Sequence, residues 1–402
     1  MRRIWWLILT VVMLLVSGSS FPALTARAQT PAAVPGPCVQ GTLPSNALSL
    51  ICLPTSGWNG DLVVYAHGYV PPGPQLVFAN LDLPGGGSLP TLTQRLGYAF
   101  ATTSYRQNGL AILEGADDIR ELIAAVPTVL GHAPRYTYLL GVSEGGLVTT
   151  LVVEQSPNLV SGGLPMCGPI GDFKAQIDYM GDFRVLFDYF FPNVIPGSPT
   201  DIPDEVMTDW DSKYVPAITQ IVSTNSFSAT QLINTSHAAI DPNQSISVVS
   251  TTLDLLWYNV FATNDAASKL GGNPYGNIGR QYSGSNDDAR LNGPQGVQRI
   301  SADQTALNAV PPYQTTGIVP RPLVVLHTTA DDIIPYAQAQ MYLSKAQLVQ
   351  QGQISLDTIE RYGHCTFTVD EALSAFYQLV KQVEANLPPV QDNKVFLPIL
   401  GR

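Results

Sequence analysis

LLGVSEGGLV, residues 139–148, is the stretch that decides the fold of this chain. Residues 136–142 form a continuous apolar and aromatic run typical of a buried strand, whereas residues 144–155 have the apolar spacing of a helix. A G-x-S-x-G at such a corner reverses the chain sharply, because side chains at the two glycine positions would collide with the neighbouring strand and helix. The turn lifts the Ser143 hydroxyl to the N-terminus of the helix, where developing negative charge is stabilised. The motif therefore predicts a nucleophile.

Strands and helices alternate on both sides of this corner. Continuous β-branched or aromatic runs predict buried strands at residues 62–66, 98–104, 136–142, 322–327 and 356–361. Apolar spacing predicts helices at residues 112–130, 144–155, 337–351 and 368–386. Alternation of this kind requires crossover connections, so we expect an α/β fold with a mostly parallel sheet covered on both faces.

One long segment interrupts the alternation. Residues 169–319 are rich in Asn, Ser, Pro, Gly and aromatic residues and contain no clear βαβ unit. An unstructured loop of this length is implausible in a compact domain, so we expect a mainly helical insertion that acts as a cap or lid. The catalytic domain would then comprise residues 60–168 and 320–388, preceded by a leader at 29–59 and followed by an apolar tail at 389–402.

The N-terminus has the pattern of a secretory signal peptide. Two arginines precede an uncharged apolar run of 13 residues, Ile4 to Val16, and the A-x-A site that signal peptidase cuts ends at Ala28. A retained membrane anchor is the alternative, but a spanning helix needs about 20 apolar residues. We therefore expect residues 1–28 to be removed, leaving a secreted protein without a membrane span.

Composition restricts the function further. The full chain has 20 basic and 31 acidic residues, and removal of the predicted signal takes away three arginines, so the net charge changes from −11 to −14. A chain this acidic is a poor partner for nucleic acid. Its 45% hydrophobic content excludes a disordered protein.

Four cysteines in an exported chain predict two disulfides, for which three connectivities exist. Cys38 and Cys52 flank a short loop and are the favoured local pair. This leaves Cys167 and Cys365, whose pairing requires both to lie at the same end of the sheet.

A serine nucleophile needs a base and an orienting acid. His364 is the candidate base because it lies in YGHC (residues 362–365), a loop without periodicity after a predicted strand. Asp331, in HTTADDIIP (residues 327–335), follows the preceding strand and gives the chain order Ser, Asp, His. Asp332 is the adjacent alternative, because spacing alone does not separate successive loop residues.

An oxyanion hole would complete the site. The predicted strand 62–66 is followed by His67, Gly68 and Tyr69, and the glycine allows the backbone to turn its N–H groups towards the serine. We expect the backbone N–H groups of Tyr69 and Glu144 to be the donors. His67 precedes the serine at a strand end, so we assign it to shaping the loop.

Together these pieces resemble the α/β-hydrolase superfamily. They are, in order, HGY at 67–69, GVSEG at 141–145, HTTADDIIP at 327–335 and GHC at 363–365. The resemblance covers both segments of the predicted catalytic domain and implies an eight-stranded, mostly parallel sheet, a Ser-His-Asp triad and a lid at the insertion. Within the superfamily the sequence is similar to secreted esterases and to the prolyl-oligopeptidase-like branch, although we recognise no propeller domain in this sequence.

A partial likeness to tannases and feruloyl esterases lies in the cysteine that follows His364. Those enzymes bridge that cysteine to one directly before the serine, where this chain has Val142. The partner of Cys365 here would instead be Cys167, which would still tether the histidine loop to the sheet.

Aromatic residues at the start of the insertion bear on the substrate. Tyr179, Phe183 and Phe187 are spaced as one face of a helix. This stripe either packs into the core beneath it or lines an apolar pocket over Ser143, and we take Phe183 and Phe187 as candidate substrate-binding residues.

The sequence thus predicts a secreted serine esterase that cleaves a small or polymeric ester through an acyl-enzyme. The alternatives are a serine peptidase of the prolyl-oligopeptidase-like type and a non-catalytic binding protein on the same scaffold. No metal or organic cofactor is needed for this mechanism. Asp287 and Asp288 could contribute oxygen ligands to a calcium ion, but a solvated turn is the favoured interpretation.

Overall fold

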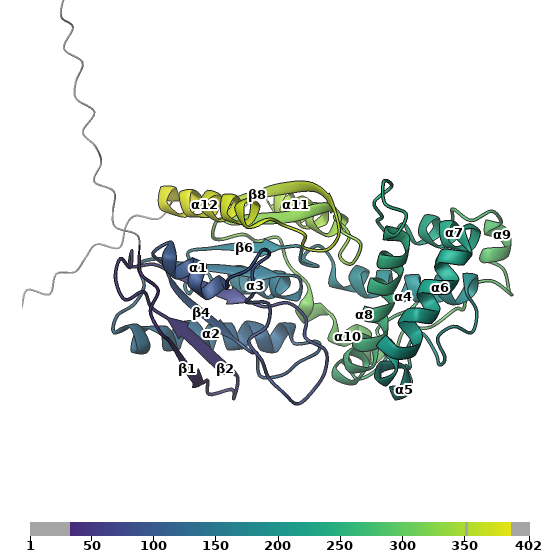
Figure 1. The fold of residues 1–402 in the computed structure, drawn as a ribbon, viewed down its shortest axis with the longest axis horizontal. Coiled ribbons are helices and arrows are strands. Elements are labelled where there is room, and N and C mark those ends of the chain that lie inside the picture. Colours follow the sequence, from purple (N-terminus) through teal and green to yellow (C-terminus); the bar gives the residue numbers. More distant parts are fainter. Residues whose placement is uncertain (1–32, 350–352, 387–402) are drawn as a thin grey trace, which may run out of the picture. The chain divides into compact units, whose positions relative to one another are not determined.

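A computed structural model describes residues 33–349 and 353–386 (Figure 1). The predicted signal peptide, 1–28, and apolar tail, 389–402, lie outside the described residues. Among the described residues, no helix has both the length and the apolar character needed to cross a membrane.

Eight strands form a single sheet in the order β1-β2-β4-β3-β5-β6-β7-β8. The strands are β1 (Cys38–Thr42), β2 (Leu48–Cys52), β3 (Leu62–Ala66), β4 (Ala99–Thr103), β5 (Thr137–Val142), β6 (Gly162–Met166), β7 (Leu323–Ala330) and β8 (Ile354–Tyr362). β1 and β2 are antiparallel to their neighbours, and all the other pairs are parallel. The predicted α/β class and the mostly parallel sheet are therefore confirmed.

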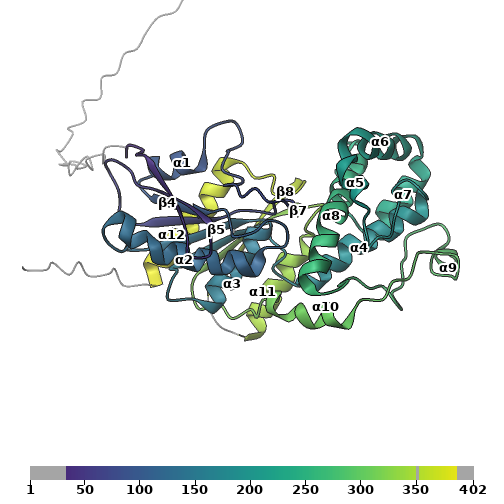
Figure 2. The ribbon, with the colours of Figure 1, turned by 90° about the horizontal axis from the view of Figure 1, so that it is seen from below.

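Helices cover both faces of this sheet. They are α1 (Leu89–Arg95), α2 (Ile112–Leu130), α3 (Glu144–Gln155), α11 (Ala337–Val349) and α12 (Val369–Asn386). In β3, Leu62 and Val64 pack with α2 and α3, whereas Val63 and Tyr65 pack towards α12 on the opposite face (Figure 2). Because successive strand residues point to opposite faces and both are covered, the strand reads as a continuous apolar run.

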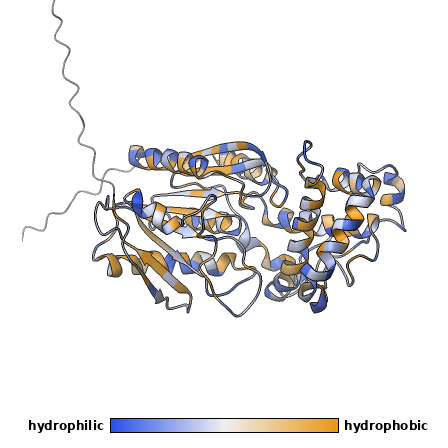
Figure 3. Ribbon diagram, viewed as in Figure 1, coloured by the Kyte–Doolittle hydropathy of each residue, from blue (hydrophilic) through white to orange (hydrophobic). Residues whose placement is uncertain are grey.

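The long connection between β6 and β7 is a helical insertion. Its elements are α4 (Phe173–Phe190), α5 (Asp204–Thr208), the π-helix η1 (Trp210–Tyr214), α6 (Val215–Thr224), α7 (Ser226–Ser236), α8 (Ser247–Leu270), α9 (Asp288–Leu291), α10 (Gln304–Ala309) and the 3₁₀ helix η2 (Pro311–Tyr313). Hydrophobic and hydrophilic residues alternate along these helices (Figure 3). The apolar sides of α4 to α9 form a core of their own, whereas Ala306 of α10 and Tyr313 of η2 pack into the core of the sheet. At the start of α4, the Asp172 side chain caps the helix by accepting from the Ala175 N–H at 3.1 Å.

The predicted calcium-like pair at α9 is a hydrogen-bonded turn. Asp287 accepts from the Arg290 N–H at 2.9 Å, and Asp288 accepts from the Ser285 N–H at 2.8 Å. Both carboxylates thus stabilise the local backbone, as expected for a solvated turn.

β6 lacks the β-branched pattern by which strands are recognised, and its sequence, GGLPM, contains two glycines and a proline. A Cβ at Gly162 would lie 2.7 Å from the Val383 side chain, and one at Gly163 would lie 2.7 Å from that of Val153. Helices on both faces approach the strand closely, so packing rather than propensity selects these glycines.

Both predicted disulfides are present. Cys38–Cys52 joins directly paired residues of β1 and β2. Cys167–Cys365 joins the residue after β6 to the loop after β8, across a sequence separation of 198 residues. Its two cysteines lie at the same end of the sheet, as that pairing requires.

Removal of either disulfide should lower the free energy of unfolding, and the long-range one should matter more. We expect Cys167→Ser with Cys365→Ser to lose about 4 kcal/mol in urea denaturation, because the closed loop is long. The matched control, Cys38→Ser with Cys52→Ser, removes a bridge across a 14-residue separation. Its loss in free energy of unfolding should be about 2 kcal/mol smaller. An equal or smaller loss from the long-range pair would contradict this expectation.

Candidate active site

Ser143 occupies a strained corner between β5 and α3. Its backbone angles are φ 54° and ψ −122°, outside the ordinary helix and strand regions. A Cβ at Gly141 would lie 2.0 Å from the Gly145 carbonyl oxygen, and one at Gly145 would lie 2.1 Å from that of Ala66. Both glycines are therefore steric requirements. The Ser143 N–H donates to the Met166 carbonyl at 2.9 Å, which fixes the corner to β6.

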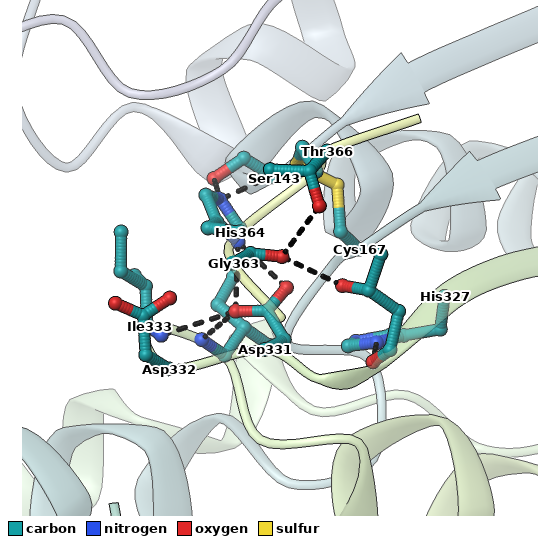
Figure 4. A network of polar contacts seen from close by, with 12 residues as sticks. Ser143, Cys167, His327, Asp331, Asp332, Ile333, Gly363, His364 and Thr366 are labelled. Atoms are coloured by element: carbon teal, nitrogen blue, oxygen red, sulfur yellow. Dashed lines mark hydrogen bonds and ion pairs between the residues drawn. A yellow bond between two sulfur atoms is a disulfide. The ribbon is translucent and has the colours of Figure 1, made fainter. Parts of the chain in front are cut away.

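Three side chains that are distant in sequence meet at the carboxyl ends of β5, β7 and β8 (Figure 4). His364 Nε2 lies 2.9 Å from Ser143 Oγ, and His364 Nδ1 lies 2.8 Å from one Asp331 carboxylate oxygen and 3.0 Å from the other. The Ile333 and Ile334 N–H groups donate to Asp331 Oδ1 at 3.0 and 2.8 Å. These bonds hold the carboxylate against the imidazole, an arrangement that orients a histidine as a base.

The electrostatics of His364 follow from this contact. Burial by itself lowers the pKa of an imidazole, but the charge and hydrogen bond of Asp331, together with the charges of Asp332 and Asp254, outweigh burial, so the pKa of His364 is raised above its ordinary 6.5. A base with a raised pKa accepts a proton from Ser143 more readily.

The structure distinguishes between the two adjacent aspartates. Asp332 makes no hydrogen bond to His364, and its Oδ2 lies 3.4 Å from the Tyr362 hydroxyl. Burial, followed by the charges of Asp254 and Asp331, raises the pKa of Asp332 to about 7. Asp331 is thus the carboxylate placed to orient the imidazole.

The loop that carries His364 is held on both sides. Gly363 has φ 100°, a conformation that favours glycine, and its N–H donates to the Ala330 carbonyl at 3.0 Å. On the other side, Cys365 is tied to Cys167. The sheet and the disulfide together fix the position of the base.

The predicted oxyanion loop lies against the nucleophile. A Cβ at Gly68 would lie 3.3 Å from Ser143 Cβ, so this backbone passes directly beside the serine. The Gly68 N–H donates to Asn80 Oδ1 at 3.1 Å. Among the hydrogen bonds of the described residues, neither the Tyr69 N–H nor the Glu144 N–H is a donor, so both can serve a ligand. Asn80 was missed from sequence, because no local pattern marks it.

The buried His67 ring packs against this loop and hydrogen-bonds its backbone. It is 2% exposed, its ring stacks on Tyr105 at 3.9 Å between centroids, and its Nδ1 hydrogen-bonds the Gly68 carbonyl at 2.7 Å. Burial lowers the pKa of His67, which favours the neutral ring. These contacts agree with a shaping role for His67.

A mainly apolar cavity of about 160 Å³ opens beside Ser143. Tyr69, Ser143 and Glu144 line it from the catalytic side, and residues of α4 and α8 line it from the insertion. The Tyr179 hydroxyl of α4 donates to the Asp332 carbonyl at 2.7 Å, so the insertion is bonded to the acid loop.

Phe183 and Phe187 do not line this cavity, contrary to our prediction. Both are fully buried in the core of the insertion, where the Phe187 ring stacks on Phe191 at 5.3 Å between centroids. Ile177 and Met180, on another face of α4, line the cavity instead. Aromatic spacing identified a buried face of the helix, but the larger residues pack into the insertion's own core.

Glu144 brings an acidic group to the cavity wall. It is 7% exposed, and its Oε1 accepts from the Ala111 N–H at 3.0 Å. Burial raises the pKa of Glu144 to about 8. The carboxyl is therefore mainly neutral at pH 7 and becomes negative at higher pH.

We expect Asp331→Asn to lower kcat by about 10³- to 10⁴-fold, because the amide cannot stabilise the protonated imidazole. The matched control is Asp332→Asn, which should retain kcat within about tenfold because its carboxyl makes no hydrogen bond to the imidazole. Steady-state kinetics on the two variants checks this, and equal losses would contradict the assignment.

We also expect a bell-shaped pH profile of kcat/KM. The acidic limb should lie above pH 6.5, because His364 must be neutral to act as a base and its pKa is raised. A decline near pH 8 should follow from ionisation of Glu144, whose negative charge opposes a developing oxyanion. Glu144→Gln should remove this decline, and a decline that persists in the variant would count against the role of Glu144.

The chain resembles several solved hydrolase structures at low sequence identity. No family model and no curated protein matches the sequence. Among solved structures, feruloyl esterase B from Aspergillus oryzae is 14% identical with a TM-score of 0.48, and the match covers 88% of this chain and 80% of that one. An esterase from Pyrococcus furiosus is 13% identical with a TM-score of 0.46, covering 87% and 91%.

An acylaminoacyl peptidase from Pyrococcus horikoshii is 13% identical with a TM-score of 0.42, and the match covers 87% of this chain but only 40% of the peptidase. Likeness at this level carries no information on the substrate. The strand order of the sheet and the glycine-bounded corner at Ser143 are themselves those of an α/β-hydrolase fold.

Proposed function

We propose that this chain is a secreted serine hydrolase that cleaves carboxylic esters through an acyl-enzyme. The observation that carries the proposal is the continuous hydrogen-bonded chain from Ser143 Oγ through the His364 imidazole to the Asp331 carboxylate. The two disulfides support an oxidising compartment, and therefore export.

The geometry supports a two-step reaction. Ser143 Oγ attacks the ester carbonyl carbon while its proton passes to His364 Nε2, and the carbonyl oxygen becomes an oxyanion beside the Tyr69 and Glu144 amides. Collapse of this intermediate breaks the bond to the alcohol, which leaves with the proton from His364. A water molecule then repeats the sequence on the acyl-enzyme, releasing the acid and restoring Ser143.

The cavity supports an apolar acyl group. Its wall is mainly apolar, and the Glu144 carboxyl in that wall is mainly neutral near pH 7. Burial of each methylene contributes about 0.8 kcal/mol, so kcat/KM should rise about fourfold per methylene until the cavity is filled.

A panel of p-nitrophenyl esters, from acetyl to palmitoyl with a feruloyl ester included, tests both substrate and nucleophile. We expect kcat/KM to rise to a medium chain and then level off or fall, and Ser143→Ala to lower kcat by about 10⁶-fold. Fluorophosphonate should label the wild type at Ser143. Absence of both turnover and labelling in folded protein would overturn the proposal.

Amide substrates tested beside the esters decide the reaction class. We expect aminoacyl p-nitroanilides to react much more slowly than the best ester. Comparable turnover would instead support a peptidase.

A further inference from the structure

Helix α8 of the insertion contacts the catalytic domain on both sides of the active site. Near its start, Thr251 Oγ1 hydrogen-bonds the Tyr362 hydroxyl at 2.8 Å, two residues before the base. Nearer its end, Asp265 accepts from the Leu110 N–H at 2.6 Å. The helix therefore runs from the histidine loop to the far wall of the cavity.

Tyr258 lies midway between these two contacts and on the same helix face. Thr251, Tyr258 and Asp265 are spaced by seven residues, about two helical turns, so their side chains point in the same direction. Because the outer two contact the catalytic domain, the middle one faces it as well. Tyr258 and Ser143 both line the cavity.

The Tyr258 phenol packs beside the side chain of Tyr69, a residue of the predicted oxyanion loop. Its ring centroid lies 5.8 Å from that of Tyr69, whose N–H is an expected oxyanion donor. The Tyr69 hydroxyl in turn donates to the Phe261 carbonyl at 3.0 Å, one turn further along α8. This bond fixes the spacing between the helix and the oxyanion loop.

The phenol keeps its proton. Burial raises the pKa of Tyr258 well above its ordinary value, the charges of Glu144, Asp331 and Asp254 raise it further, and a hydrogen bond with Ser143 offsets only part of this. Tyr258 is thus a neutral O–H donor beside the reacting oxygen.

We propose that Tyr258 is a further catalytic residue, a donor from the insertion to the oxyanion beside the Tyr69 and Glu144 amides. In the free enzyme Tyr258 and Ser143 line the same cavity. As Ser143 Oγ bonds to the carbonyl carbon, the oxyanion forms in this cavity, and the phenol, which stays protonated, donates to it. The inference rests on the proposed function and makes the insertion part of the catalytic machinery.

Tyr258→Phe tests this with the best ester from the panel. We expect kcat to fall by about 10²-fold, as for loss of one oxyanion donor, with KM within about threefold. The matched control is Tyr282→Phe, which also removes a buried hydroxyl of the insertion, one bonded to Asp182 at 2.7 Å, and should retain kcat. Thermal unfolding of both variants checks that the fold is intact.

A fall in kcat of less than about threefold, or a rise in KM alone, would overturn the inference. A second measurement needs no variant: a crystal structure of the wild type with an alkyl boronic acid bound to Ser143. Tyr258 Oη within about 3 Å of the boronate oxygen in the oxyanion position supports the inference, and a separation beyond about 4 Å overturns it. A wild type that neither turns over esters nor reacts with fluorophosphonate would instead overturn the proposed function itself.

Discussion

The site depends on one imidazole held between a carboxylate and a hydroxyl. His364 bridges Asp331 and Ser143 only because β5, β7 and β8 are parallel and end at the same edge of the sheet. An antiparallel strand at any of these positions would place its side chain at the opposite edge. The parallel order in turn requires helical crossovers, and these bury both faces of every central strand. Architecture and chemistry thus follow from the same constraint.

Rigidity around the site comes from several separate structural features. Two glycines permit the corner at Ser143, and the disulfide to Cys167 holds the residue after His364. Helix α8 adds bonds to the loops on either side of the cavity. An insertion bonded in this way acts as a wall of the cavity, and it brings polar groups of its own to the site. Preorganised donors of this kind stabilise charge without rearranging during the reaction.

Local pattern predicted much of this structure. The helices at 112–130 and 144–155 have the predicted bounds, because apolar spacing is a local property of the sequence. β6 has no such local pattern, because its glycines are required by close packing against side chains that are distant in sequence. The stripe of α4 is buried in a core, one of its two expected placements, but Phe183 and Phe187 do not line the cavity, because spacing shows that a face is buried and not what buries it. Asn80 and Tyr258 reach the site only through tertiary contacts, which a single sequence does not encode locally.

The helical insertion also lies between the nucleophile and its partners in chain order. Ser143 and His364 are 221 residues apart, so synthesis delivers the serine long before the imidazole that activates it. In the proposed enzyme, a nascent chain therefore carries an unactivated hydroxyl until the segment with His364 has been made. Contacts between residues this far apart in sequence slow folding, because the entropy of closing the chain is lost before the contact forms. In the hydrolase proposed here, the complete site therefore forms only after most of the chain has been made.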